Sequence, residues 1–176
     1  EACDWSSDVC SSDLLTLVAA AQPKGVLLTH ANLLANIRAV GAALDIRPDD
    51  VAVSWLPLYH DMGLIGCLLT PLLACRPITL LRPEDFVARP RLWLEALSQT
   101  RASITAAPNF AYGLCADRID DAVVKTLDLS GLEIALCGAE TVMRDTLDLT
   151  IADTGRSIQR RLSKSTMNVL EKWINQ

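Results

Sequence analysis

The sequence predicts an α/β fold in which a partial, mainly parallel sheet is flanked by helices. From Gly25 onward, short apolar runs alternate with segments that have helical period and length. Turn-forming residues separate these segments, as in the Pro-Asp-Asp stretch at residues 48–50. Strands separated by helices of about ten to fifteen residues imply right-handed crossovers and parallel pairing. The alternation fades beyond Val142, so we expect the sheet to be partial.

The first expected elements are a strand, a helix and a second strand. Residues 26–28 form a short apolar run, and Thr29 can cap a helix over residues 30–44. One face of that helix is apolar and carries Leu33, Leu34, Ile37 and Val40. The second strand is the apolar run at residues 51–56, which ends before Pro57.

Three further units follow, each with a helical segment and then a short apolar run. They are residues 64–73 with 78–81, residues 89–99 with 103–106, and residues 109–119 with 133–137. A last helical period at residues 161–175 has no strand after it. We therefore expect a domain over residues 15–142 and a divergent helical tail over residues 143–176.

Residues 1–14 are expected to be a disordered leader that packs against nothing. A near-repeat of Ser-Ser-Asp at residues 6–8 and 11–13 gives the segment low complexity and no hydrophobic period. It resembles the translated sequencing-adapter read-through found at the start of some open reading frames. The domain is therefore expected to begin after it.

Composition excludes several classes of function. The net charge of −5 argues against a nucleic-acid binder, which needs a basic face. No basic segment precedes an apolar run near the start, and the longest apolar stretch, residues 62–75, is shorter than the ~20 residues of a membrane span. We expect no secretion signal, no membrane span and a cytoplasmic protein.

The cysteines indicate neither disulfides nor a metal site. Six cysteines include no CxxC pair, and only two histidines accompany them. Four cysteines have apolar neighbours in the sequence and are expected to pack as small hydrophobes: Cys67, Cys75, Cys115 and Cys137.

Three predicted strands end in segments with unusual polar or small residues. These segments are residues 56–61 (L-P-L-Y-H-D), 107–110 (A-P-N-F) and 137–140 (C-G-A-E). Because ligands of parallel sheets gather outside the carboxyl ends of the strands, this edge is the expected site.

Four ordered motifs give the chain a family resemblance. They lie at residues 23–33 (P-K-G-V-L-L-T-H-A-N-L), 55–64 (W-L-P-L-Y-H-D-M-G-L), 107–112 (A-P-N-F-A-Y) and 138–140 (G-A-E). Together they resemble the adenylate-forming acyl ligases, nearest the fatty acyl-AMP ligases, over about residues 22–142. The resemblance implies that the predicted sheet is part of the large N-terminal domain of such an enzyme.

The resemblance also implies a reaction with its cofactors and partners. In this family a fatty acid and ATP give acyl-AMP and pyrophosphate, with Mg²⁺ offsetting the phosphate charge. The acyl group then passes to the thiol of an acyl carrier protein, or to coenzyme A in sister enzymes. Two alternatives remain open, an acyl-CoA synthetase fragment and a non-catalytic remnant that binds acyl chains.

Site residues carry over by position in the motifs. His60 is expected at the mouth of the acyl tunnel as the catalytic residue, although it could instead only cap the following helix. Nucleotide contacts are expected from Lys24, Gly25, Gly138, Ala139 and Glu140. Acyl contacts are expected from Tyr59, Asp61, Met62, Gly63, Asn109, Phe110 and Tyr112.

For most of these assignments a purely structural role is the alternative. Lys24 could be a solvated surface residue, and residues 138–140 could be a turn that needs glycine. Asp61 could be an ordinary first-turn acid at a helix N-terminus, and aromatic residues on a helix are more often core.

The sequence also departs from the family. The signature reads T-S-G-[ST]-T-G-x before P-K-G, whereas residues 16–22 read T-L-V-A-A-A-Q. The blocks that would supply a metal-facing Glu, a ribose-binding Asp and the catalytic Lys of the small domain have no counterpart after residue 142. We therefore expect this chain alone to be inactive.

Overall fold

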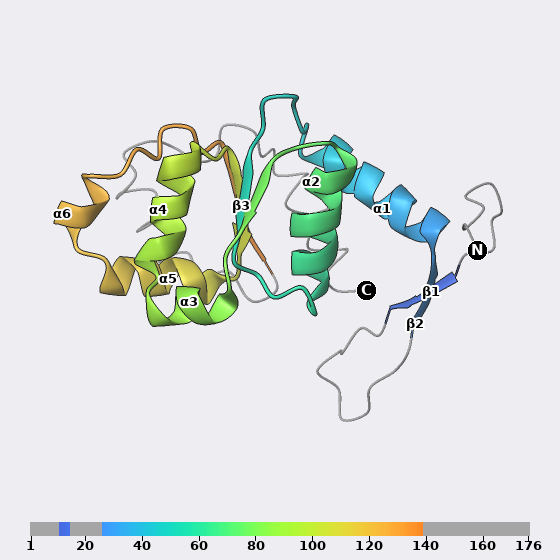
Figure 1. Cartoon of the computed structure of the whole chain (residues 1–176), viewed down its shortest axis with the longest axis horizontal. Helices are drawn as coiled ribbons and strands as arrows, with labels where there is room; N and C mark the ends of the chain where they lie inside the picture. The colour runs from blue at the N-terminus through green and yellow to red at the C-terminus, as the bar shows by residue number, and fades with distance from the viewer. Residues whose placement is uncertain (1–10, 15–25, 139–176) are drawn as a thin grey trace.

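The computed structural model describes residues 11–14 and 26–138 as a layered α/β structure (Figure 1). Its strands are β1 (Ser11–Leu14), β2 (Val26–Thr29), β3 (Ala52–Ser54), β4 (Ile78–Leu80), β5 (Ile104–Ala107) and β6 (Ile134–Cys137). Its helices are α1 (His30–Ala43), the π-helix η1 (Met62–Leu69), α2 (Thr70–Leu73), α3 (Pro83–Ala88), α4 (Arg91–Thr100), α5 (Asn109–Arg118) and α6 (Asp121–Val124).

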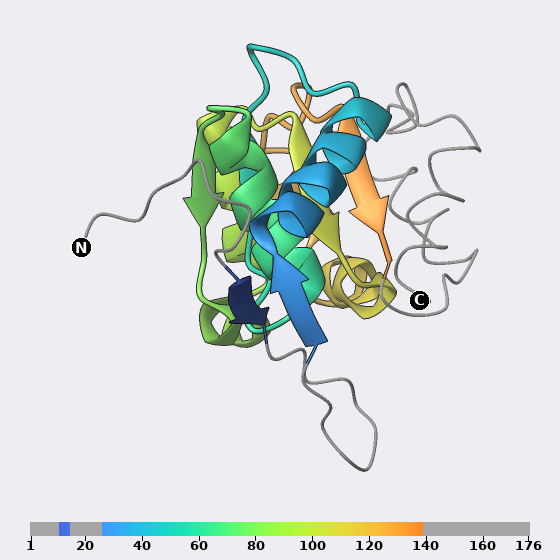
Figure 2. The same ribbon diagram turned by 90° about the vertical axis from the view of Figure 1, so that its right-hand side faces the viewer.

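The main sheet has four parallel strands in the order β4-β3-β5-β6. Helices α3, α4 and α5 lie on one side of it, and α1, η1 and α2 lie on the other (Figure 1). Figure 2 shows β6 at one edge of the sheet, beyond α1. The predicted fold class, a parallel sheet flanked by helices, is confirmed.

A second, two-stranded sheet contradicts part of the prediction for the leader. Strand β1 pairs antiparallel with β2, with Ser12 opposite Leu28. The prediction that the leader packs against nothing is therefore wrong for Ser11–Leu14. It relied on side-chain period alone, whereas strand pairing satisfies backbone N–H and C=O groups whatever the side chains are. Residues 1–10 and the predicted tail lie outside the described residues.

Helix α1 begins as the sequence predicts. The Thr29 hydroxyl accepts a hydrogen bond from the Asn32 backbone N–H at 3.1 Å. The Asn32 side chain in turn accepts from the Thr29 backbone N–H at 3.1 Å. This reciprocal capping box satisfies N–H groups that have no partner inside the helix.

The second helix begins earlier than predicted and is a π-helix in its first part. The backbone N–H and the hydroxyl of Thr70 both donate to the Ile65 carbonyl, the hydroxyl at 2.7 Å. Pro71 follows and has no N–H, and in an α-helix its ring would clash with the carbonyl four residues earlier. A wider turn just before Pro71 removes that conflict.

The third predicted helix corresponds to α4, and a separate short helix, α3, precedes it. Pro83 begins α3 and is followed by the acidic pair Glu84 and Asp85 in the first turn, which suits a helix N-terminus. Pro90 then separates α3 from α4. The prediction of one helix over residues 89–99 therefore missed α3, and it also missed the single turn of α6.

Aromatic rings fill the layer between the sheet and α3 and α4. Trp55 stacks on Phe86 with ring centroids 3.9 Å apart, and Trp93 packs edge-on against both rings. The Trp93 indole N–H donates to the Thr105 hydroxyl at 3.1 Å, and that hydroxyl donates to the Val53 carbonyl at 2.8 Å. Helix α4 is thus tied through one polar chain to β5 and β3.

The amino edge of the sheet is tied by a buried carboxylate. Asp50 accepts hydrogen bonds from the Ser103 hydroxyl at 2.7 Å and from the Arg47 backbone N–H at 2.6 Å. The Ser103 hydroxyl also accepts from the Val51 backbone N–H at 3.0 Å. These bonds align the starts of β3 and β5.

In the described ranges no helix has the length and apolarity to cross a bilayer.

The described cysteines are free thiols that differ in burial. Burial raises the pKa of Cys67 to about 11 and that of Cys115 to about 12. Cys75 is exposed, which corrects the expectation that it packs as a small hydrophobe. It follows α2 with a left-handed backbone (φ 54°), where the chain turns out of the helix.

Thiol alkylation should follow this difference. At about pH 8, iodoacetamide should label Cys75 in the folded chain and leave Cys67 and Cys115 unlabelled, because the thiolate is the reactive form and burial disfavours it. Peptide mass spectrometry measures the labelling site by site, and denatured chain serves as the control in which all three react. Equal labelling of Cys67 and Cys75 in the folded chain would contradict this burial pattern.

Candidate functional site

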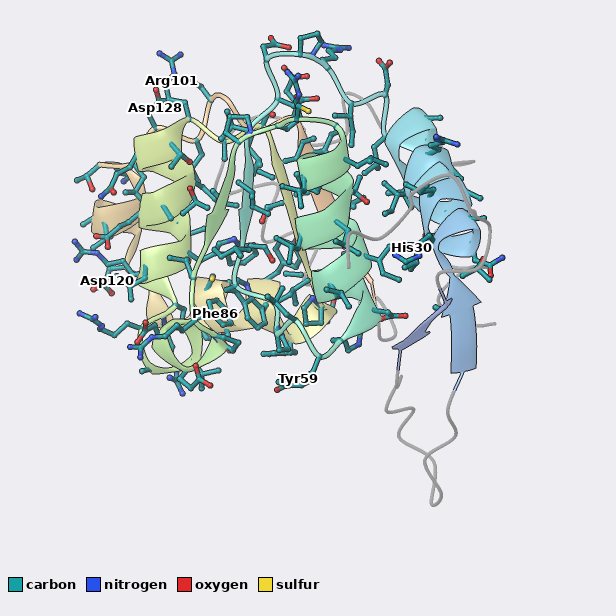
Figure 3. The ribbon with its side chains drawn as sticks, turned by 45° about the vertical axis from the view of Figure 1, so that its right-hand side comes forward. His30, Tyr59, Phe86, Arg101, Asp120 and Asp128 are labelled. Atoms are coloured by element: carbon teal, nitrogen blue, oxygen red, sulfur yellow. The ribbon has the colours of Figure 1, made fainter. Side chains whose placement is uncertain are left out.

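The three unusual strand ends lie at one edge of the main sheet. Strands β3, β5 and β6 run parallel in this sheet, so the residues that follow them leave from the same side. Figure 3 shows Tyr59 at this carboxyl edge, with Arg101 and Asp128 at the opposite edge. Topology therefore places residues 56–61, 107–110 and 137–138 at the same edge of the sheet.

On the β5–β6 side of this edge, α5 is fastened to the end of β6. The Tyr112 hydroxyl donates to the Leu136 carbonyl at 2.7 Å, and the Cys137 thiol lies 4.0 Å from Asn109 Oδ1. The Gly138 backbone N–H donates to the Ala107 carbonyl at 3.3 Å. The predicted site residues Asn109, Tyr112 and Gly138 are thus brought together.

Tyr112 is a buried phenol in this arrangement. Burial raises the pKa of Tyr112 well above its usual value, and the neighbouring thiols add to this effect. Its hydroxyl is already committed to Leu136, and its ring packs against Trp93 at 5.4 Å. These contacts fit a residue that holds α5 in place.

Phe110, on the same helix α5, is exposed where Tyr112 is buried. Its side chain is 48% exposed, and its ring meets the edge of Trp55 at 6.0 Å. Trp55 immediately follows β3, so this contact joins the segment after β3 to the start of α5. Trp55 has no role predicted from the sequence. Its position within the motif at residues 55–64 was the available signal.

On the β3 side, His60 and Asp61 form a close pair. The Nδ1 atom of His60 lies 2.9 Å from Asp61 Oδ1, and the Met62 backbone N–H donates to Asp61 Oδ1 at 2.7 Å. The same N–H lies 3.2 Å from His60 Nδ1. A nitrogen this close to a carboxylate oxygen carries a proton, so we assign the proton to Nδ1, which leaves Nε2 for a ligand.

The other predicted residues of this segment differ in exposure. Tyr59 is 80% exposed and points away from the body of the structure (Figure 3). Met62 and Gly63 are buried at the start of η1. Strand β5 lies between β3 and β6, so the ends of β3 and β6 are about 10 Å apart, which is two strand spacings.

Several predicted nucleotide contacts lie outside the described residues: Lys24, Gly25, Ala139 and Glu140. Within residues 11–14 and 26–138, no three His, Cys, Asp or Glu side chains gather as metal ligands.

A family of known proteins matches most of the chain. The model of the AMP-binding enzymes matches residues 20–160, which continues past residue 142, where the resemblance was expected to end. A medium-chain-fatty-acid–[acyl-carrier-protein] ligase of Teredinibacter turnerae, TtuA, is 41% identical over 126 residues, covering 72% of this chain and 20% of that protein. A probable long-chain-fatty-acid–AMP ligase of Mycobacterium tuberculosis, FadD30, is 37% identical over 152 residues, covering 82% of this chain and 25% of that protein.

Solved structures agree with the sequence relatives. A fatty acyl-adenylate ligase from L. pneumophila, in complex with acyl adenylate and pyrophosphate, superposes with a TM-score of 0.76 at 36% identity. The match covers 80% of this chain and 25% of that one. The chain thus spans about a fifth to a quarter of the length of these proteins.

Proposed function

The chain belongs to the AMP-binding enzyme family, and we propose that it is part of the nucleotide-binding domain of a fatty acyl-AMP ligase. The proposed reaction of the whole protein joins a fatty acid to ATP, giving acyl-AMP and pyrophosphate. The acyl group then passes to the thiol of an acyl carrier protein. This substrate class is supported by the relatives: TtuA is a medium-chain-fatty-acid ligase, FadD30 is a probable long-chain-fatty-acid–AMP ligase, and the L. pneumophila protein is a fatty acyl-adenylate ligase.

The observation that carries the proposal is the His60–Asp61 pair at the carboxyl edge of the sheet. A fatty carboxylate and a triphosphate are both anionic, so a site that joins them must supply hydrogen-bond donors or positive charge. With Nδ1–H held by Asp61, protonation of His60 places a second donor at Nε2. We therefore propose that His60 binds an oxygen of the carboxylate or of the α-phosphate.

The acyl chain requires an apolar surface beside this donor. The buried Trp55 ring packs against Phe110, and the side chains of Phe110, Leu58 and Tyr59 are exposed at this edge. We propose that the first atoms of the acyl chain lie against these three exposed residues. ATP and Mg²⁺ would be supplied as in the whole enzyme, and the acceptor could also be coenzyme A, because the relatives include a putative fatty-acid–CoA ligase.

A second candidate is a non-catalytic protein that binds acyl chains. It is favoured by residues 17–21, which lack the glycines and hydroxyls of the family's phosphate loop. Titration calorimetry separates the candidates. A ligase fragment should bind a non-hydrolysable acyl-adenylate analogue more tightly than the matching fatty acid, whereas an acyl-binding remnant should bind both alike.

Replacing His60 should weaken binding of the acyl-adenylate analogue. For His60→Ala we expect the dissociation constant to rise about tenfold or more, because a hydrogen bond to a charged group is worth roughly 1.5–3 kcal/mol. The matched control is His30→Ala, which removes the other histidine of the chain at the start of α1, away from this edge (Figure 3). Equal affinities of the two variants would contradict the role proposed for His60.

A further inference from the structure

We infer that Gly63 is a positioning residue, whose missing side chain allows the Pro57 carbonyl to sit against η1 and so fixes the His60 imidazole. This inference rests on the function proposed for His60. It also assigns Gly63 a role different from the acyl contact that the family resemblance implies, because Gly63 has no side chain and its backbone is buried.

Close packing is the reason for glycine at this position. A methyl group placed on Gly63 would overlap the Pro57 carbonyl oxygen, lie 3.0 Å from the carbonyl carbon and lie 3.2 Å from Leu56 Cβ. The first two are backbone atoms, which cannot rotate away as the end of a flexible side chain can. Any side chain at residue 63 therefore displaces the backbone at Pro57.

That backbone holds His60. The Pro57 carbonyl accepts a hydrogen bond from the His60 N–H at 3.2 Å, and the His60 carbonyl accepts from the Leu64 N–H at 2.8 Å. The imidazole Nδ1 lies 2.9 Å from Asp61 Oδ1, and that carboxylate oxygen is itself held by the Met62 N–H. The turn at residues 57–60 and the first turn of η1 thus pack against each other at Gly63. Displacing the backbone of either turn moves the His60 imidazole relative to the other turn.

The chain offers a matched control three residues further along η1. A methyl group placed on Gly66 would meet nothing within 4 Å, so Gly66→Ala makes the same chemical change in the same π-helix without contact. Gly63→Ala and Gly66→Ala therefore differ in the contact with Pro57 and share the gain in helix propensity.

The first readout is the imidazole itself, followed without any ligand. Heteronuclear NMR of isotope-labelled chain shows only two imidazoles, His30 and His60, and His60→Gln identifies the second. In the unmodified chain and in Gly66→Ala, the His60 proton should reside on Nδ1. In Gly63→Ala, His60 should show the averaged tautomers of a solvated imidazole, while His30 stays unchanged. An unchanged His60 in folded Gly63→Ala would overturn the inference.

The second readout links position to binding. Gly63→Ala should weaken binding of the acyl-adenylate analogue as much as His60→Ala does, and the double variant should lose no more than about twofold beyond either. Additive losses would overturn the positioning role. If the unmodified chain does not bind the analogue, the proposed function fails, and the NMR result still decides the inference.

A third measurement tests the inference even if Gly63→Ala does not fold. Hydrogen exchange of the unmodified chain should show that the backbone N–H groups of His60 and Leu64 are protected, because both are hydrogen-bonded in the turn. Exchange of the His60 N–H at the rate of an unprotected amide would show that the turn is not held, and would overturn the inference.

Discussion

Phe86→Ala is expected to lower the free energy of unfolding by about 3–5 kcal/mol, the usual cost of truncating a buried aromatic residue. Phe86 is fully buried at 0% exposure and stacks on Trp55 at 3.9 Å. Its removal also takes away the edge contact with Trp93. Trp93 anchors α4 to β5 through the hydrogen bond from its indole N–H to Thr105. Since domains of this size are stable by about 5–15 kcal/mol, the variant should lie close to unfolding.

Val87→Ala is the matched control for this prediction. Val87 is the next residue of α3 and is 53% exposed, so its truncation should change stability by no more than about 0.5 kcal/mol. Urea unfolding followed by circular dichroism measures both variants against the unmodified chain. Similar midpoints for the two variants would show that the stack of Trp55 on Phe86 does not hold α3 against the sheet.

The fold class could be predicted because each buried strand is also an apolar run in the sequence. An apolar run in the sequence and the hydrogen-bonded strand that it contains nevertheless need not have the same bounds. Residues 51–56 were predicted as a strand, whereas β3 covers Ala52–Ser54 and Trp55 and Leu56 are buried after pairing has ended. Burial continues past the hydrogen-bonded ladder, so a hydrophobic pattern overestimates the length of the strand.

The missed elements depend on backbone effects that periodicity does not express. Strand β1 is defined by its pairing with β2, and η1 by the wide turn before Pro71. Helix α3 is only six residues long, too short to show a period, although Pro83 and the acids after it were a readable start signal.

The site was predictable as an edge of the sheet, and less so as a set of side chains. Parallel topology alone brings residues 56–61, 107–110 and 137–138 to one edge. The path of the chain into η1 then decides that Tyr59 is exposed while Met62 and Gly63 are buried. A family motif groups these residues together, and only packing distinguishes a residue that could touch a ligand from one that positions its neighbour.

The phosphate loop carries the prediction with the largest effect on function. Residues 16–22 read T-L-V-A-A-A-Q where the family signature reads T-S-G-[ST]-T-G-x. Glycines allow successive backbone N–H groups to converge on an anion, and the hydroxyls add donors. Loss of a single positioned donor typically costs about a hundredfold in rate, or ~3 kcal/mol. With ATP, magnesium and fatty acids of graded length, we expect no pyrophosphate release above the buffer control.

Repair of the loop should restore nucleotide binding. The variant with Leu17→Ser, Val18→Gly, Ala19→Thr, Ala20→Thr and Ala21→Gly carries the family signature before Pro23. By titration calorimetry it should bind ATP at least about tenfold more tightly than the unmodified chain, a gain of about 1.4 kcal/mol. Lys24→Ala should weaken binding in the repaired chain and change little in the unmodified one, because a lysine contributes to phosphate binding when the loop holds the phosphate beside it. Steady pyrophosphate release by the unmodified chain that His60→Ala abolishes, or equal ATP affinity before and after repair, would show that residues 16–22 are not what limits nucleotide binding.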